Sequence, residues 1–127
     1  MKHKVICVDD QVGIRMLLKE ILKEDYSVKT VGTGEEAIRV SKDFKPDVIV
    51  VDMHLEDMNG TDVLDKLKSI DSDIKAIMIT GYEEEFIFKQ LKSVKPEFIL
   101  KKPFDIVSMQ KKLSYLTKES HLESACV

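Results

Sequence analysis

Five polar residues stand directly at the ends of short apolar runs, and their types suit chemistry on a phosphoryl group. Asp9 and Asp10 follow VICV, Asp52 follows VIVV, Thr80 closes AIMIT and Lys102 follows FILK. Three carboxylates brought together repel one another unless a cation offsets their charge, and Mg²⁺ or Mn²⁺ accepts such oxygen ligands. A carboxylate beside that ion can form an aspartyl phosphate, while an ammonium and a hydroxyl contact the phosphoryl oxygens.

Each of these residues alone has an ordinary structural role. An aspartate after a strand commonly caps the next helix or opens a loop. A threonine suits a β-strand, and a lysine is usually solvated. What indicates a site is the conjunction, because each group closes a different predicted strand.

The elements that must position these residues follow from the spacing of apolar side chains. Short apolar runs, typical of buried strands, alternate with segments of helical spacing. The predicted strands are residues 5–8, 27–31, 48–51, 76–80 and 98–101. The predicted helices are residues 12–24, 35–43, 61–70 and 83–94, with a last helix that begins after Asp105. Asp10 or Gln11 is expected to cap the first helix, and Thr33 with Glu36 forms a capping box for the second.

This alternation predicts an α/β fold with a doubly wound, five-stranded parallel sheet between two layers of helices. The run VIVV is apolar on both faces, as in a central strand covered from both sides. The carboxyl ends of parallel strands share one edge of the sheet, and ligand sites lie there. The five polar residues are therefore expected at that edge.

Composition restricts the class of protein. The chain has 127 residues, enough for one domain, of which 43% are hydrophobic and 34% charged. A formal net charge of −3 argues against nucleic acid or an anionic membrane as the main partner. Cys7 is expected to be a buried free thiol and Cys126 to lie in a loose tail, so no disulfide is expected. The apolar run near the N-terminus is too short for a signal peptide, and no run approaches the about 18 residues of a membrane span, so we expect a soluble cytoplasmic protein.

Four motifs together resemble a response-regulator receiver domain over residues 4–118. They are VDD at 8–10, DMHLEDMNG at 52–60, MITGY at 78–82 and KKPF at 101–104. The resemblance implies a flavodoxin-like strand order of 2-1-3-4-5, a receiver domain over residues 1–119 and a flexible tail over residues 120–127. It also implies a role for each matching residue: Asp52 as phosphoacceptor, Thr80 as switch hydroxyl, Lys102 as the partner of the phosphoryl group, and Asp9, Asp10, Asp52 and the backbone carbonyl of His54 as Mg²⁺ ligands.

The resemblance extends to turns and partners. The bond between Lys102 and Pro103 is expected to be cis, and Gly60 is expected to relieve backbone strain in a tight turn. Within the family, DDQVGIRMLLKEIL and KPFDI are most similar to single-domain intermediates of sporulation-type phosphorelays. The partners that this similarity implies are a sensor histidine kinase or a histidine phosphotransferase, which would donate the phosphoryl group, and a downstream regulator or phosphatase. The matching docking residues are Gln11, Ile14, Pro103 and Phe104, and the fourth and fifth helices offer a face for a weak homodimer.

The chain departs from the family pattern at two places. Ile99 stands where the family usually has an aromatic residue coupled to the switch threonine, and the adjacent Phe98 should point to the opposite face of its strand. Pro96-Glu97 replaces the usual Gly-Ala before the last strand. His54 and Tyr82 occupy two positions that tend to tune the lifetime of the phosphoryl group in the family, and Tyr82 is large enough to shield an acyl phosphate from water.

Other classes fit less well. A phosphatase of the haloacid type needs an acid where this chain has His54, and a flavodoxin needs a phosphate-binding loop where it has DDQVG. The chain lacks the P-loop motif, and its intact set of site residues argues against a receiver that never takes phosphate. We therefore expect a phosphoacceptor that promotes its own phosphorylation and dephosphorylation, without being an enzyme with an external product. The remaining alternative is the receiver part of a longer regulator with a DNA-binding or other output domain.

Overall fold

The computed structural model describes residues 2–81, 89, 91 and 94–125. Tyr82, Cys126 and most of the helix predicted at residues 83–94 lie outside the described residues. The strands are β1 (His3–Val8), β2 (Tyr26–Val31), β3 (Val48–Asp52), β4 (Lys75–Thr80) and β5 (Phe98–Lys101). The helices are α1 (Val12–Leu22), α2 (Gly34–Phe44), α3 (Gly60–Ile70) and α5 (Ile106–Ala125).

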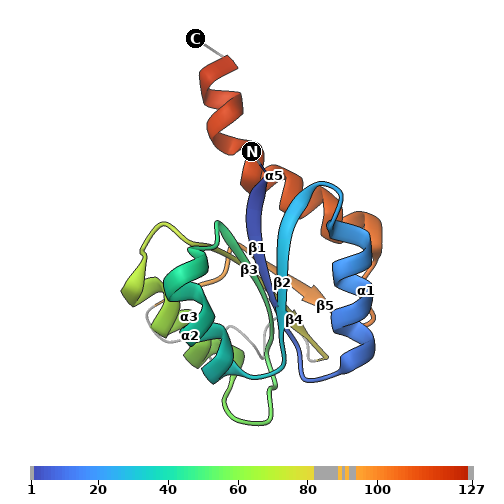
Figure 1. Cartoon of the computed structure of the whole chain (residues 1–127), viewed down its shortest axis with the longest axis vertical. Coiled ribbons are helices and arrows are strands. Elements are labelled where there is room, and N and C mark those ends of the chain that lie inside the picture. Colours follow the sequence, from blue (N-terminus) through green and yellow to red (C-terminus); the bar gives the residue numbers. More distant parts are fainter. Residues whose placement is uncertain (1, 82–88, 90, 92–93, 126–127) are drawn as a thin grey trace.

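The described strands form one parallel sheet in the order β2-β1-β3-β4-β5, as predicted. Figure 1 shows α1 and α5 on one face of this sheet and α2 and α3 on the other. Each face has its own buried cluster, since alternate residues of a strand point to opposite sides. One cluster joins Ile49 and Val51 to α2 and α3, and the other joins Val48 and Val50 to α1 and α5. All five residues of β3 are buried, which confirms it as a central strand.

The start of α1 differs from the prediction. Gln11 occupies the N-cap position, but its side chain makes no capping hydrogen bond, so the expected cap by Asp10 or Gln11 is wrong. Asp9 Oδ1 instead accepts the Gln11 N–H at 2.9 Å. The carboxylate that closes β1 therefore also fixes the turn into α1.

Thr33 caps α2 as predicted, because its Oγ1 accepts the Glu36 N–H at 3.1 Å. The return bond of the capping box is displaced by one residue. Glu36 Oε1 accepts the N–H of Gly32, at 3.2 Å, where the motif would have it bond the N-cap residue. The turn between β2 and α2 is therefore fixed from both sides.

Gly60 is required for a different reason from the one expected. None of the described glycines has a positive φ, so relief of backbone strain is the wrong explanation for this residue. A Cβ added at Gly60 would lie 2.5 Å from the carbonyl oxygen of Asp52 and 3.0 Å from Met53 Cα. Glycine is needed because α3 begins in direct contact with the end of β3.

Glu97, part of the Pro96-Glu97 departure, ties the start of β5 to β4. Its N–H donates to the Ala76 carbonyl at 2.9 Å, and its Oε1 accepts the Ala76 N–H at 2.6 Å. Lys68 Nζ from α3 lies 3.5 Å from Glu97 Oε2. Through its backbone N–H and its side chain, Glu97 thus bonds both backbone groups of Ala76 just before β5 begins.

The last helix begins at the predicted cap and extends past the end of the sheet. Asp105 Oδ2 accepts the Ser108 N–H at 3.3 Å, which confirms the predicted cap. The helix continues to Ala125, and Figure 1 shows its end projecting beyond the sheet. The domain boundary at residue 119 and the flexibility of residues 120–127 stay predictions. In the described part of the chain, no helix combines the length and the apolar character that crossing a membrane requires.

Candidate functional site

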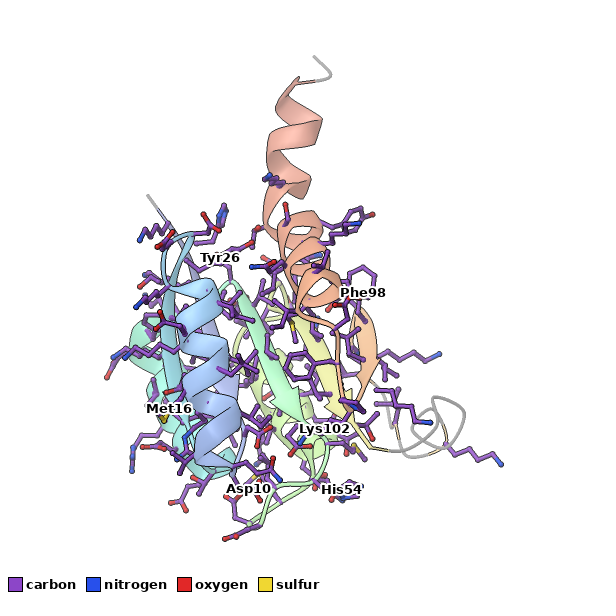
Figure 2. All side chains as sticks on the ribbon, turned by 90° about the vertical axis from the view of Figure 1, so that its right-hand side faces the viewer. Asp10, Met16, Tyr26, His54, Phe98 and Lys102 are labelled. Atoms are coloured by element: carbon purple, nitrogen blue, oxygen red, sulfur yellow. The ribbon has the colours of Figure 1, made fainter. Side chains whose placement is uncertain are left out.

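Three carboxylates meet at the carboxyl edge of the sheet. Asp9 and Asp10 follow β1, and Asp52 is the last residue of the adjacent strand β3, whose register pairs Val8 with Val51. One carboxylate oxygen from each aspartate lies within 4.8 Å of the other two. Figure 2 shows Asp10 and Lys102 at this same end of the sheet. The parallel topology therefore brings the predicted acidic residues together.

Lys102 reaches the carboxylates from the far side of β4. Its Nζ lies 3.1 Å from Asp52 Oδ2 and 3.4 Å from Asp9 Oδ2. Its backbone N–H donates to the carbonyl of Thr80 at 2.6 Å, and its bond to Pro103 is cis, as the family resemblance implied. The ammonium offsets part of the negative charge of the site.

The environment of Asp9 favours a further cation. The residue is 1% exposed, and its Oδ2 accepts no hydrogen bond among the described residues, although the Lys102 ammonium lies 3.4 Å away. Burial raises the pKa of Asp9 above its ordinary value, the Gln11 N–H lowers it, and the charge of Asp52 raises it again. A buried carboxylate that is costly to ionise, and that has an oxygen which accepts no hydrogen bond, suits a hard metal ion.

Lys102 stays charged in this setting. Burial of the ammonium lowers the pKa of Lys102, but the hydrogen bond and charge of Asp52, followed by the charge of Asp9, outweigh it, so the pKa lies above its ordinary value. A fixed positive charge beside Asp52 can pair with a group of several negative oxygens. The site therefore has a permanent cation of its own.

Each carboxylate oxygen of Asp52 accepts a hydrogen bond from a different residue. Its side chain is largely buried, its Oδ2 faces Lys102, and its Oδ1 accepts the N–H of His54 at 3.2 Å. Thr80 is fully buried at the end of β4, between the strands that supply Asp52 and Lys102. His54 is exposed in the loop that follows β3.

The four predicted docking residues divide into two kinds. Gln11 and Pro103 are exposed beside the site, whereas Ile14 and Phe104 are half-buried against the cluster formed by α1 and α5. Met16, which the sequence analysis did not single out, is 68% exposed on α1. The spacing of apolar residues in this helix does not show that Met16 faces solvent, whereas the structure does.

Ile99 and Phe98 point to opposite faces, as predicted. Ile99 packs against the cluster formed by α2 and α3, while Phe98 packs against the cluster formed by α1 and α5. Phe98 also makes an edge-to-face contact with Tyr115, with ring centroids 6.0 Å apart. The aromatic ring nearest in sequence to the usual switch position is therefore engaged on the other side of the sheet.

Two residues near the site were missed from the sequence. Arg15 Nη1 donates to the backbone carbonyl of Asp9 at 2.6 Å, which holds the turn after β1. Asp57 accepts backbone N–H groups at the start of α2. Arg15 stands one helical turn after Gln11, a spacing that places it near that turn, whereas nothing in the sequence pattern distinguishes Asp57 from other loop acids.

Comparison with known proteins gives one consistent result. Residues 5–114 match the family model of the response regulator receiver domain. Sporulation initiation phosphotransferase F of Bacillus subtilis is 36% identical over 84% of this chain and 86% of its own length. Chemotaxis protein CheY of Thermotoga maritima is 32% identical over 90% of this chain and 99% of its own. A CheY-like receiver domain from Methanospirillum hungatei superposes with a TM-score of 0.86 at 26% identity, over 97% of this chain and 99% of that one.

Proposed function

The chain belongs to the response regulator receiver family, and from this premise we propose that it accepts a phosphoryl group from a phosphohistidine onto Asp52. The observation that carries the proposal is the contact of Lys102 Nζ with Asp52 Oδ2 inside a cluster of three carboxylates. An isolated acidic cluster would bind a cation without further chemistry. A lysine that contacts the same carboxylate can also neutralise part of the negative charge that a phosphoryl group adds there.

The transfer is a displacement at phosphorus. An oxygen of Asp52 forms a bond to phosphorus while the bond from phosphorus to the histidine nitrogen breaks, and its electron pair returns to the imidazole. Lys102 pairs with the phosphoryl oxygens, and the Thr80 hydroxyl bonds one of them. Asp9, Asp10, Asp52 and the carbonyl of His54 are the residues that would hold Mg²⁺, which supplies positive charge against the phosphoryl oxygens when bound.

A histidine kinase or histidine phosphotransferase is the partner that such a transfer requires. Gln11 and Pro103 are exposed beside the site, and Val12 and Met16 extend an exposed apolar surface along α1. Apolar side chains at this spacing fit the face of a partner helix. We assign docking to this surface, with Ile14 and Phe104 supporting it from beneath.

Intact mass after incubation with acetyl phosphate tests the proposal. We expect one added phosphoryl group in the wild-type protein with Mg²⁺, and none in Asp52→Asn or without the metal. Asp43→Asn, a change at an exposed aspartate of α2, is the matched control and should be phosphorylated like the wild type. A wild-type protein that gains no mass, or an Asp52→Asn protein that does, would overturn the assignment.

A further inference from the structure

The loop that follows the candidate phosphoacceptor is attached to a second helix. Asp57 lies in this loop, between β3 and α3, and both of its carboxylate oxygens accept backbone N–H groups of α2. The Gly34 N–H donates to Oδ1 at 2.9 Å, and the Glu35 N–H donates to Oδ2 at 3.0 Å. These amides have no acceptor within their own helix, because they belong to its first turn.

The attachment completes the capping of α2. Thr33 serves the next two amides, since its Oγ1 accepts from Glu36 and its carbonyl accepts from Ala37. Asp57 therefore supplies the acceptors for the Gly34 and Glu35 N–H groups, which Thr33 does not bond. The hydrogen bond from Gly34 lowers the pKa of Asp57 below its ordinary value, so the carboxylate is charged, as the positive end of a helix dipole prefers.

Close packing supports the same contact. A Cβ at Gly34 would lie 2.5 Å from Met58 Cγ and 2.7 Å from Val63 Cγ2. Only glycine allows the residue after Asp57 to reach the start of α2 in this way. The loop is thus fixed at its tip by two hydrogen bonds and an apolar contact, and at its base by the hydrogen bond from the Gly60 N–H to the Met53 carbonyl at 2.7 Å.

The loop in turn fixes the site. The N–H of His54 bonds Asp52 Oδ1, and the carbonyl of the same residue is a proposed metal ligand. A shift of the loop would therefore move both the acceptor carboxylate and that ligand. We infer that Asp57 is a positioning residue, which holds the loop on α2 so that Asp52 and the His54 carbonyl meet the metal and the phosphoryl group in productive geometry; this inference rests on the proposed function.

The test compares Asp57→Ala and Asp57→Asn with Glu56→Ala, a change at the adjacent exposed carboxylate of the same loop. The rate of phosphorylation by acetyl phosphate is measured against Mg²⁺ concentration, and amide hydrogen exchange is followed at Gly34 and Glu35. Loss of a group that orients a metal ligand typically weakens metal binding by about tenfold or more. We expect the half-saturating Mg²⁺ concentration to rise about tenfold in Asp57→Ala, to rise less in Asp57→Asn, which keeps one acceptor oxygen, and to stay within about twofold in Glu56→Ala.

Faster exchange at Gly34 and Glu35 in Asp57→Ala, together with the changed Mg²⁺ dependence, would support the inference. Asp57→Ala with the wild-type Mg²⁺ dependence, or with unchanged exchange at both amides, would overturn it and leave the proposed function standing. A purely structural role would lower stability in urea without changing the Mg²⁺ dependence of the folded protein, and would also overturn it. A wild-type protein that takes up no phosphoryl group would overturn the proposed function and, with it, the role of Asp57 in positioning.

Discussion

Lys102 Nζ donates a hydrogen bond to Asp52 Oδ2 at 3.1 Å, although β4 separates the strands from which the two residues come. The contact is possible because both side chains extend past the carboxyl edge of the sheet, where β4 ends at Thr80. Lys102 also lies 3.4 Å from Asp9 Oδ2. One ammonium therefore pairs with a carboxylate from β3 and with another from the turn after β1. A metal ion bound at this place would neutralise the same two carboxylates.

Replacing Lys102 with Met should destabilise the metal-free protein. The change leaves two largely buried carboxylates without their cation, and we expect the free energy of unfolding to fall by about 1–3 kcal/mol, less than for a fully buried pair because Lys102 is partly exposed. Mg²⁺ should restore more stability in Lys102→Met than in the wild type. Urea denaturation with and without Mg²⁺ measures both effects, and Lys102→Arg, which keeps the charge, is the control. Equal stabilisation of wild type and Lys102→Met by Mg²⁺ would contradict the shared-charge explanation.

Gly60→Ala should be strongly unfavourable, whereas Gly13→Ala should not. The new methyl group at Gly60 would lie 2.5 Å from the backbone oxygen of Asp52, while nothing lies within 4 Å of a Cβ at Gly13. Overpacking against backbone costs about 1–3 kcal/mol, and replacing glycine by alanine within a helix contributes about 0.5–1 kcal/mol of stability. Thermal unfolding of both variants measures these opposite changes. A Gly60→Ala protein as stable as the wild type would show that α3 can move away from β3 at little cost.

The strands and the carboxyl-edge residues could be predicted from the sequence, because burial and parallel pairing follow from runs such as VIVV. Once the sheet is parallel, Asp9, Asp52 and Lys102 must end at one edge. The contact of Asp57 with Gly34 could not be predicted in this way, since it joins residues 23 positions apart through the path of a loop. The capping of α1 was mispredicted for a related reason. A capping residue can be recognised by type, but the competing bond from Gln11 to Asp9 depends on where the turn places the carboxylate.

Glu97→Ala should cost more stability than Glu97→Gln. The alanine leaves the buried Ala76 N–H without the acceptor that now lies 2.6 Å away, and an unsatisfied buried donor costs about 1–3 kcal/mol. The glutamine keeps an acceptor oxygen and loses only the charge that faces Lys68. Lys68→Met isolates that ion pair and should change the free energy of unfolding by less than about 1 kcal/mol. Urea denaturation of the three variants gives the order, and equal losses for Glu97→Ala and Glu97→Gln would show that the charge, and not the acceptor, matters.

Alkaline pH should destabilise the protein through Cys7. Burial, followed by the charge of Asp9, raises the pKa of this thiol from 9.0 to about 12. Below pH 9 the thiol keeps its proton in both states, and its contribution to stability is fully present. Between pH 9 and about 12 the unfolded chain loses the proton while the native protein keeps it, so this contribution falls by about 1.4 kcal/mol per pH unit. Lysines and tyrosines titrate in the same range, so the informative quantity is the difference in free energy of unfolding between the wild type and Cys7→Ala. That difference, measured by urea denaturation from pH 8 to pH 11, should favour the wild type at pH 8 and shrink as the pH rises, whereas a constant difference would mean that the thiol ionises equally in both states.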